Sequence, residues 1–346
     1  PFVRSCFVNI GLHECFRTNC NEMRIGIAQL NATVGDLDGN LALAVDAYEQ
    51  LVGQGVDLVV YPELFLCGYP PRDLLLKSRF GKDLAERLDA FAKQTGPTPA
   101  VMGFAEESGK ETGRPYFNSA AWCMNGEVSE IARKRLLPTY DVFDEARYFE
   151  TCNDLLIVEY KGKKVAVTIC EDLWNAEGDL YDSNPIDDIV QALPDLVLNL
   201  SASPWHRGKQ NIRHELLSKV AMACACPIVY VNVVGGNDEL IFDGGSLAVN
   251  KEGQFLSQLP AFVESIRVID LSEEPSKPAT PTGNESLDNL RKALVLGLRD
   301  YAQKSGFTKG LVGLSGGIDS AVTCALAAEA LGSSNVLGIS LPSAIS

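Results

Sequence analysis

The chain has 346 residues, 46% of them hydrophobic, and carries a formal net charge of −15. Because domains usually contain roughly 100–250 residues, this length predicts one complete domain and part of a second. The acidity argues against binding nucleic acid or anionic lipid, since both require clustered Lys and Arg. No apolar run reaches the ~18 residues of a membrane span. We therefore expect a cytoplasmic protein that acts on small polar molecules.

Cysteine and histidine usage excludes several kinds of site. The ten cysteines have no CxxC spacing, which indicates reduced thiols. Cys224 and Cys226 lie in an apolar run and are interpreted as inert core residues. The three histidines form no zinc-like cluster, and none has the setting of a triad base. A nucleophile in this chain therefore needs a different base.

Regular patterning begins at Met23, so residues 1–22 are interpreted as a disordered or artefactual leader without a signal-peptide core. Residues 23–271 alternate strand-like apolar runs with helical segments such as Asn40–Leu51 and Gln210–Ala223, which indicates a layered α/β domain. The runs at Phe117–Met124, Val128–Arg133 and Leu155–Tyr160 are predicted to be neighbouring antiparallel strands in a mixed sheet.

A second, smaller unit follows a proline-rich segment. Residues 272–284 contain three prolines and few apolar side chains, which is typical of an interdomain linker. Residues 285–346 then predict a helix at Leu287–Gln303, a strand in "GLVGL", a helix at Ser320–Leu331 and a strand in "NVLGIS". This order predicts a parallel βαβ unit that is incomplete as a domain.

Three candidate catalytic side chains each lie at or just beyond an apolar strand. They are Glu63 in "VVYPELFLCGY", Lys134 in "IARKRLLPTYDVFDE" and Cys170 in "VAVTICEDLW". A thiol, a carboxylate that moves its proton and an ammonium that stabilises an oxyanion suffice for attack on a carboxamide. The nearby cation is expected to favour the thiolate. Each residue alone also has an ordinary structural interpretation.

Glu145 is a candidate second carboxylate that orients Lys134, and Tyr69 and Tyr140 are candidate walls of the pocket. Jointly the motifs resemble the nitrilase, or carbon–nitrogen hydrolase, superfamily over residues 24–270. The resemblance implies an α-β-β-α sandwich and a Glu-Lys-Cys triad. Within that superfamily, "RKRLLPTYDVFDEARYF" and "NLSASPWHRGKQNIR" are similar to the glutaminase domain of NAD synthetases.

That similarity implies glutamine as the substrate. It suggests Tyr140, Ser203 and Lys209 as glutamine-binding residues, with Tyr69 beside them. A lysine or a hydroxyl can hold the α-carboxylate of glutamine, and an acceptor can hold its amino group. No cofactor is implied for this hydrolytic step.

A second motif lies between the predicted strand "GLVGL" and the predicted helix at Ser320–Leu331. The segment "GLVGLSGGIDSAV" can cradle a pyrophosphate with backbone N–H groups and the positive end of a helix. Asp319 is a candidate Mg²⁺ ligand, because a carboxylate next to phosphate needs a cation. The motif lacks the Lys of a Walker loop. The candidate ATP-binding residues are Gly313, Leu314, Ser315, Gly316, Gly317, Ile318, Asp319 and Ser320.

This loop is similar to the "SGGxDS" loop of pyrophosphatase-type ATP-binding enzymes. Following a nitrilase-type domain, it resembles the glutamine-dependent NAD synthetase family, which implies ATP, Mg²⁺, deamido-NAD and a homo-oligomer. Ala344 and Ile345 depart from that family's "MPSRYS" pattern. The resemblance implies a fragment that retains mainly the glutaminase half. Two alternatives stay open, namely a stand-alone amidase or nitrilase and a non-catalytic scaffold.

Overall fold

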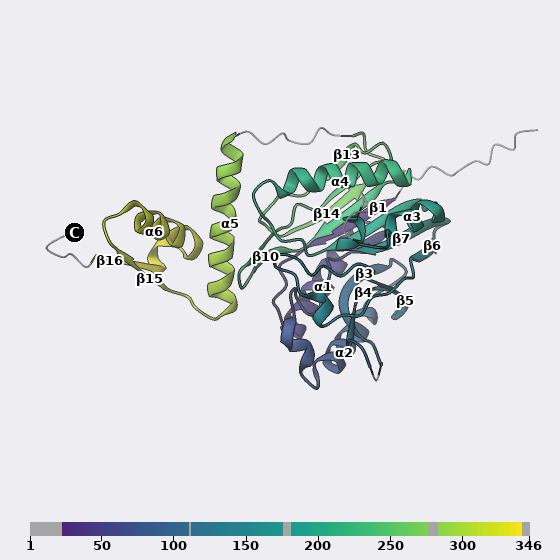
Figure 1. Cartoon of the computed structure of the whole chain (residues 1–346), viewed down its shortest axis with the longest axis horizontal. Helices are drawn as coiled ribbons and strands as arrows, with labels where there is room; N and C mark the ends of the chain where they lie inside the picture. Colours follow the sequence, from purple (N-terminus) through teal and green to yellow (C-terminus); the bar gives the residue numbers. More distant parts are fainter. Residues whose placement is uncertain (1–22, 111, 176–180, 276–282, 341–346) are drawn as a thin grey trace, which may run out of the picture.

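The computed structural model describes residues 23–110, 112–175, 181–275 and 283–340. The predicted leader at 1–22 lies outside the described residues, as do Ala344 and Ile345 and residues 276–282 of the predicted linker. The described part consists of a layered body and a smaller unit, with a long helix between them (Figure 1). No helix in those described ranges is long and apolar enough to cross a membrane.

One six-stranded sheet of the body has the order β14-β1-β2-β3-β4-β5. Its strands are β1 (Arg24–Gln29), β2 (Leu58–Val60), β3 (Ala100–Glu107), β4 (Tyr116–Met124), β5 (Glu127–Arg133) and β14 (Ser265–Asp270). The central strands β1, β2 and β3 are parallel, and the outer pairs are antiparallel. Helices α1 (Leu37–Gly53) and α2 (Phe80–Ala92) pack on one face of this sheet.

The other six-stranded sheet has the order β13-β12-β9-β8-β7-β6. Its strands are β6 (Leu156–Tyr160), β7 (Lys163–Ile169), β8 (Leu196–Ser201), β9 (Ile228–Asn232), β12 (Leu247–Val249) and β13 (Phe255–Gln258). Helices α3 (Pro185–Ala192) and α4 (Lys209–Cys224) pack on its outer face. Cys224 and Cys226 are buried in that outer core, as expected.

An inner core lies between the two sheets and follows from the two-residue period of a strand. Leu58 and Val60 of β2 point into this inner core, whereas Val59 points to the helices. In β8, Leu196 and Leu198 point inward in the same way, and Val197 packs on the outer side. The continuous apolar runs reflect strands buried on both faces. The predicted α-β-β-α sandwich is confirmed.

One predicted strand pairing is wrong. β4 and β5 form the predicted antiparallel pair, but β6 pairs with β7 in the other sheet. Each segment forms a strand as predicted, but a strand-like run alone does not identify the strand's partner. Residues 134–155 between β5 and β6 are too long for a tight hairpin, and they cross from one sheet to the other. That crossing carries Lys134 and Glu145.

The smaller unit contains β15 (Gly310–Leu314), α6 (Ile318–Leu331) and β16 (Val336–Ser340), with β15 and β16 parallel. The predicted βαβ order is therefore confirmed. Before it, α5 (Gly283–Lys304) packs against a two-stranded hairpin of the body, β10 (Val234–Asn237) and β11 (Leu240–Asp243). Figure 1 shows α5 between the body and the βαβ unit.

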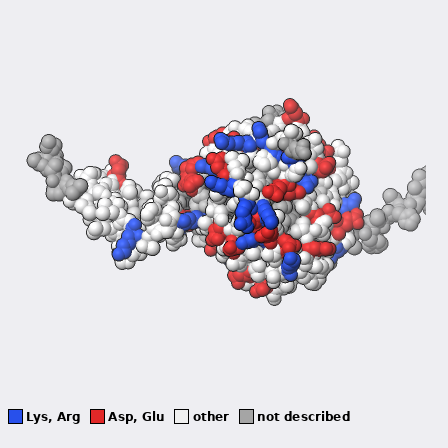
Figure 2. All heavy atoms as spheres, turned by 90° about the horizontal axis from the view of Figure 1, so that it is seen from below, with Lys and Arg blue, Asp and Glu red and all other residues white. Residues whose placement is uncertain are grey.

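The surfaces of the two parts differ. Mixed Lys, Arg, Asp and Glu side chains cover the visible face of the body, whereas the βαβ unit is mostly uncharged (Figure 2). Exposed apolar residues of that unit include Leu311, Ile318, Val322 and Leu337. The sheet of this unit has two strands, so its apolar side chains have little to pack against.

Candidate active site

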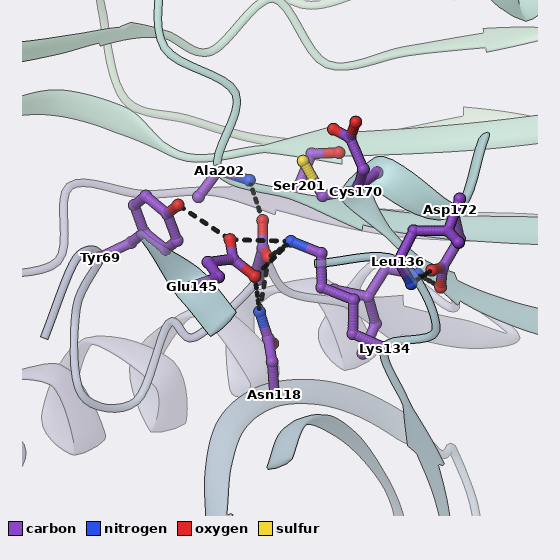
Figure 3. A network of polar contacts seen from close by, with 12 residues as sticks. Tyr69, Asn118, Lys134, Leu136, Glu145, Cys170, Asp172, Ser201 and Ala202 are labelled. Carbon is purple, nitrogen blue, oxygen red and sulfur yellow. Dashed lines mark hydrogen bonds and ion pairs between the residues drawn. The ribbon is translucent and has the colours of Figure 1, made fainter. Parts of the chain in front are cut away.

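The four candidate catalytic residues meet at strand ends between the two sheets. Glu63 follows β2, Lys134 follows β5 and Cys170 follows β7, while Glu145 begins a short 3-10 helix in the segment that crosses between the sheets. Their exposed fractions are 1%, 1%, 3% and 4%, respectively. Figure 3 shows the sulfur of Cys170 pointing toward the group around Lys134 and Ala202. The structure thus brings all four predicted residues together in a buried cluster.

Lys134 is the centre of this cluster. Its Nζ lies 2.7 Å from Oε1 of Glu63 and 2.8 Å from each carboxylate oxygen of Glu145. Burial lowers the pKa of Lys134, but Glu145 and Glu63 outweigh this and raise the pKa well above its ordinary value. Lys134 is therefore held as an ammonium between the two carboxylates.

Glu63 has two further partners that fix its orientation. The side-chain amide of Asn118 on β4 donates to Oε1 at 2.7 Å, and the backbone N–H of Ala202 donates to Oε2 at 2.7 Å. Ala202 directly follows β8, so Glu63 spans the space between the sheets. A carboxylate held by several donors keeps a single rotamer, which a general base requires.

Glu145 orients Lys134 and is itself oriented by Tyr69, whose hydroxyl donates to Oε1 at 2.9 Å. Burial raises the pKa of Glu145 to about 7, with Lys134 opposing and Glu63 reinforcing the rise. The prediction that Glu145 orients Lys134 is consistent with these contacts. Tyr69 is buried, and its hydrogen bond to Glu145 holds that carboxylate in place beside Lys134.

Cys170 lies at the junction of β7 and a short 3-10 helix (Cys170–Leu173) with φ of +42°. A non-glycine residue in this left-handed region costs about 1–3 kcal/mol, and such strain is common at reactive positions. Burial and then Glu63 raise the thiol pKa well above its usual value, and Lys134 only partly offsets them. Lys134 does favour the thiolate, as expected, but burial and the carboxylates outweigh its effect on the thiol pKa. The thiol must lose its proton during attack.

Asp172 joins the two segments that carry Lys134 and Cys170. Its Oδ1 accepts the backbone N–H groups of Arg135 at 2.9 Å and Leu136 at 3.0 Å, and its Oδ2 accepts that of Ile169 at 2.9 Å. Burial raises the pKa of Asp172 to about 6, against the lowering effect of these bonds. Asp172 thus sets the spacing between the ammonium and the thiol.

A second group of polar side chains lies next to the sulfur. The buried carboxylate of Glu171 accepts hydroxyl hydrogen bonds from Tyr140 and Tyr181, both at 2.9 Å. Lys209, the first residue of α4, places its Nζ 3.9 Å from the ring centre of Trp174. Burial lowers the pKa of Lys209, while Cys170 and, more weakly, Glu171 raise it. The carboxylate of Glu171 and the ammonium of Lys209 therefore both interact electrostatically with the thiol of Cys170.

The remaining predicted glutamine-binding residue, Ser203, is buried, and its backbone N–H donates to Oδ1 of Asn232 at 2.9 Å. Tyr140 is 45% exposed and packs edge-on against Phe143. Ser203 is thus enclosed by the fold, whereas Tyr140 is partly open to solvent. The roles of Tyr140, Ser203, Lys209 and Tyr69 in binding glutamine stay predictions.

Sequence reasoning did not identify Asn118, Glu171, Asp172 or Tyr181 as site residues. Glu171 and Asp172 directly follow Cys170 in "CEDLW", and two consecutive acids after a buried strand are a usable signal, because buried carboxylates need partners. Asn118 gave no such signal. It stands beside Ser119 in an otherwise apolar strand, and only the register of β4 against β3 directs it toward Glu63.

The predicted phosphate loop lies in the βαβ unit. Ser315 Oγ is 3.2 Å from Ser320 Oγ, and Ser320 Oγ donates to the backbone oxygen of Gly317 at 3.0 Å. Gly316 has φ of +85°, and a Cβ there would meet no atom within 4 Å. Gly317 caps α6 without a side-chain hydrogen bond. An open, glycine-lined helix N-terminus of this kind fits a phosphate group.

Asp319 lies in the first turn of α6 and is exposed. Among the residues that the structure describes, no group of three or more His, Cys, Asp or Glu side chains could hold a metal ion. A single carboxylate is still compatible with Mg²⁺, which usually keeps several waters and binds substrate phosphates. The metal-binding role of Asp319 stays a prediction.

Comparisons with known protein families agree with this geometry. Residues 24–276 match the carbon-nitrogen hydrolase family, and residues 290–346 match the NAD synthase family. A glutamine-dependent NAD(+) synthetase from Synechocystis sp. is 44% identical over 334 residues, which cover 92% of this chain and 59% of that protein. A glutamine-dependent NAD(+) synthetase from Thermotoga maritima is 39% identical, and the match covers 93% of this chain and 60% of that protein. The chain thus spans about three fifths of the length of these curated relatives.

Solved structures give the same result. The glutamine-dependent NAD+ synthetase of Acinetobacter baumannii, solved with ADP, matches 93% of this chain and 60% of its own at a TM-score of 0.83 and 36% identity. An amidase from Nesterenkonia sp. shares the fold at a TM-score of 0.62 and 24% identity. The match over residues 24–276 covers well over half of the sequence. The chain therefore belongs to the carbon-nitrogen hydrolase family.

Proposed function

We propose that this chain hydrolyses the side-chain amide of glutamine and releases ammonia. The observation that carries the proposal is the buried cluster of Cys170, Lys134, Glu63 and Glu145, beside which Glu171 and Lys209 present opposite charges. The first four residues can cleave an amide. The last two match the α-amino and α-carboxylate groups of an amino acid.

The first step is attack of the Cys170 sulfur on the amide carbon. Because the thiol is protonated at rest, Glu63 takes its proton as the S–C bond forms. The carbonyl oxygen becomes negative, and the ammonium of Lys134 stabilises it in a pocket without competing water. Glu63 then gives the proton to the departing nitrogen, so ammonia leaves and a thioester remains on Cys170.

The second step consumes one water molecule. Glu63 is again the base and takes a proton from water, whose oxygen attacks the thioester carbon. Collapse of the second oxyanion breaks the C–S bond, and Glu63 returns the proton to the sulfur. The products are glutamate and the original thiol, so the net reaction is the hydrolysis of one amide bond.

Recognition of glutamine is assigned to the second group of side chains. Glu171 has two tyrosine hydroxyls on one oxygen, Oε1, and its carboxylate is the candidate partner of the α-ammonium. Lys209 is stacked on Trp174 and partly desolvated, so its charge interacts strongly with a carboxylate. Ser203 and Tyr140 complete the proposed pocket.

Substrate specificity tests this proposal against the alternative of a general amidase. Ammonia release is measured with glutamine, asparagine and propionamide for the wild type and for the Glu171→Gln and Lys209→Met variants. We expect kcat/KM for glutamine to fall about 10–100-fold, since a charged hydrogen bond contributes about 1.5–3 kcal/mol. Activity with propionamide should stay unchanged.

Lys251→Met and Glu252→Gln are the matched controls, because they remove an exposed ion pair of 3.8 Å elsewhere on the body. Equal loss of activity with glutamine and propionamide would count against amino-acid recognition by Glu171 and Lys209. Propionamide cleaved faster than glutamine by the wild type would favour the general amidase. No ammonia from any amide would favour the scaffold hypothesis.

We further propose that the ammonia serves an ATP-dependent amidation of deamido-NAD. The match of residues 290–346 to the NAD synthase family and the names of the relatives support this second activity. The backbone of Ser315–Gly317 and the N-terminus of α6 would hold the phosphates of ATP, with Asp319 next to Mg²⁺. ATP, when bound, supplies an adenylate leaving group for the carboxylate. Isothermal titration with ATP and Mg²⁺ tests this assignment, and unaltered binding in Asp319→Asn would contradict the metal role.

A cytoplasmic location and a homo-oligomeric state are also proposed. The net charge of −15 and the resemblance to the NAD synthetase family support them. Light scattering on purified protein tests the oligomer, and a monomeric mass at micromolar concentration would contradict it. Fractionation of the source cells tests the location.

A further inference from the structure

Helix α5 is attached to the body by two charged residues one helical turn apart. Lys304 Nζ lies 2.7 Å from Asn31 Oδ1, 3.0 Å from the Ala32 oxygen, 3.1 Å from the Gly236 oxygen and 2.9 Å from Asn237 Oδ1. Oδ2 of Asp300 accepts from the Asn31 side-chain amide and the Gly236 N–H, both at 2.7 Å. Asp300 is buried, and the Lys304 side chain is 17% exposed. This many contacts fix α5 firmly against β10.

Asn237 extends this attachment toward the candidate active site. Its Oδ1 accepts from Lys304, while its Nδ2 donates to the backbone oxygen of Tyr69 at 2.9 Å. An amide has one accepting and one donating end, so a cation at the oxygen determines that the nitrogen faces Tyr69. The Tyr69 hydroxyl donates to Glu145, and Glu145 holds Lys134 at 2.8 Å.

The β10–β11 hairpin is a continuous bridge between α5 and the loop that carries Tyr69. On the α5 side, a Cβ on Gly236 would lie 3.0 Å from the Cα of Gly297, so the two backbones are in close contact. On the other side, Arg72 forms ion pairs with Asp238 and Glu239 at the tip of the hairpin. The hairpin therefore cannot move relative to α5 without disturbing the Tyr69 loop.

We propose that Lys304 is a positioning residue for the candidate active site and acts through Asn237 and Tyr69 on Glu145 and Lys134. The inference rests on the proposed function only in that it assigns Lys134 and Glu145 to the chemistry at Cys170. α5 lies largely within the segment that matches the NAD synthase family. The contact therefore links the position of that segment to the reactivity of the amide-cleaving site.

Alkylation of Cys170 by iodoacetamide tests the proposal without any need for glutamine turnover. In this reaction the sulfur displaces iodide and loses its proton, so the rate reports how well Lys134 and the carboxylates are placed. Rates are followed by peptide mass spectrometry from pH 6 to 9, with the partly exposed Cys152 as an internal reference. Lys304→Met and Asn237→Asp are compared with the wild type.

Asn237→Asp keeps the acceptor for Lys304 but loses the donor to Tyr69, so it isolates the proposed link. We expect both variants to alkylate Cys170 about tenfold more slowly at neutral pH, equivalent to about one unit in the thiol pKa. The double variant should be no slower than either single one, because both changes break the same link. Lys292→Met is the matched control, since Lys292 lies on α5 and forms an ion pair with the partly exposed Asp288 of the same helix.

Two results would overturn the proposal. One is an unchanged Cys170 rate in both variants, with thermal unfolding showing that they are folded. The other is a slow Lys304→Met with a normal Asn237→Asp, because α5 would then stabilise the fold without acting through Asn237. A wild type that alkylates at Cys170 but releases no ammonia from glutamine would contradict the proposed function alone.

Discussion

The candidate sites in the body and in the βαβ unit differ in how deeply they are buried. In the body, Lys134, Glu63 and Glu145 are almost completely buried and bonded to one another, and two sheets of six strands enclose them. In the βαβ unit, the loop before α6 lies on a two-stranded sheet, and the adjacent Ile318 is 74% exposed. The first site is enclosed, whereas the second is open.

The two sites also rely on different chemical groups. Covalent attack on an amide needs charged side chains held in a dry pocket, which only a large packed core can supply. A phosphate loop uses backbone N–H groups and a helix N-terminus, which one strand, one turn and one helix already provide. We therefore expect mutations at the buried site of the body to lower both its stability and its amide hydrolysis. Mutations in the phosphate loop should leave the stability and the amide hydrolysis of the body unchanged.

The largest effect is expected for Lys134→Met. This change leaves two buried carboxylates without their ammonium, which costs about 3–5 kcal/mol in the free energy of unfolding. It also removes the oxyanion partner, so glutamine hydrolysis should fall about 10³-fold. Urea titration and ammonia assays measure the two effects. Lys164→Met, at an exposed position on β7, is the control, and equal stability of the two variants would contradict the account.

A smaller loss is expected for Asn118→Ala, which removes one donor from Glu63. A hydrogen bond to a charged group is worth about 1.5–3 kcal/mol, so kcat should fall roughly 10–100-fold while KM changes little. Steady-state kinetics separate the two constants. Asn211→Ala, on the exposed face of α4, should leave both unchanged. A rise in KM alone would place Asn118 in substrate binding instead.

The pH dependence sharpens the comparison, because buried carboxylates of the body titrate in an accessible range. Burial raises the pKa of Glu145 to about 7, so its carboxylate becomes protonated as the pH falls below 7. Lys134 then loses a charged partner, and kcat/KM should fall about tenfold per pH unit below that value. In Glu145→Gln, kcat/KM should be low and should not change with pH below 7. An unchanged acidic limb in this variant would assign the titration to another group.

The smallest effect is expected in the βαβ unit. Gly316→Ala places a side chain at φ of +85°, which costs about 1–2 kcal/mol locally. The loop is open and distant from the core of the body. The rate of glutamine hydrolysis should therefore stay within about twofold of the wild type, and the midpoint of the main unfolding transition within a few degrees. Calorimetry and ammonia release check this. A large loss of either would show that the two parts are more tightly coupled.

Strand and helix patterns were sufficient to predict most elements and the βαβ order, whereas the α-β-β-α sandwich was implied by the resemblance to the nitrilase superfamily. Motif spacing was sufficient to select Glu63, Lys134 and Cys170, because each follows an apolar strand. The partner of β6 could not be predicted, since alternation specifies a buried face but not a neighbour. Asn118 was missed for a related reason, as its contact with Glu63 depends on tertiary register. The net rise of the thiol pKa was not predicted, because neither the burial of Cys170 nor the carboxylates around it are visible in the sequence.

The central claim is that Cys170 cleaves the glutamine amide through a thioester. The most direct measurement incubates the wild type and Cys170→Ala with glutamine, quantifies ammonia and glutamate, and examines acid-quenched protein by mass spectrometry for a glutamyl group on Cys170. We expect equal amounts of ammonia and glutamate from the wild type, a glutamyl adduct on Cys170 and no turnover by Cys170→Ala. Glutamine hydrolysis that survives in Cys170→Ala would contradict the account.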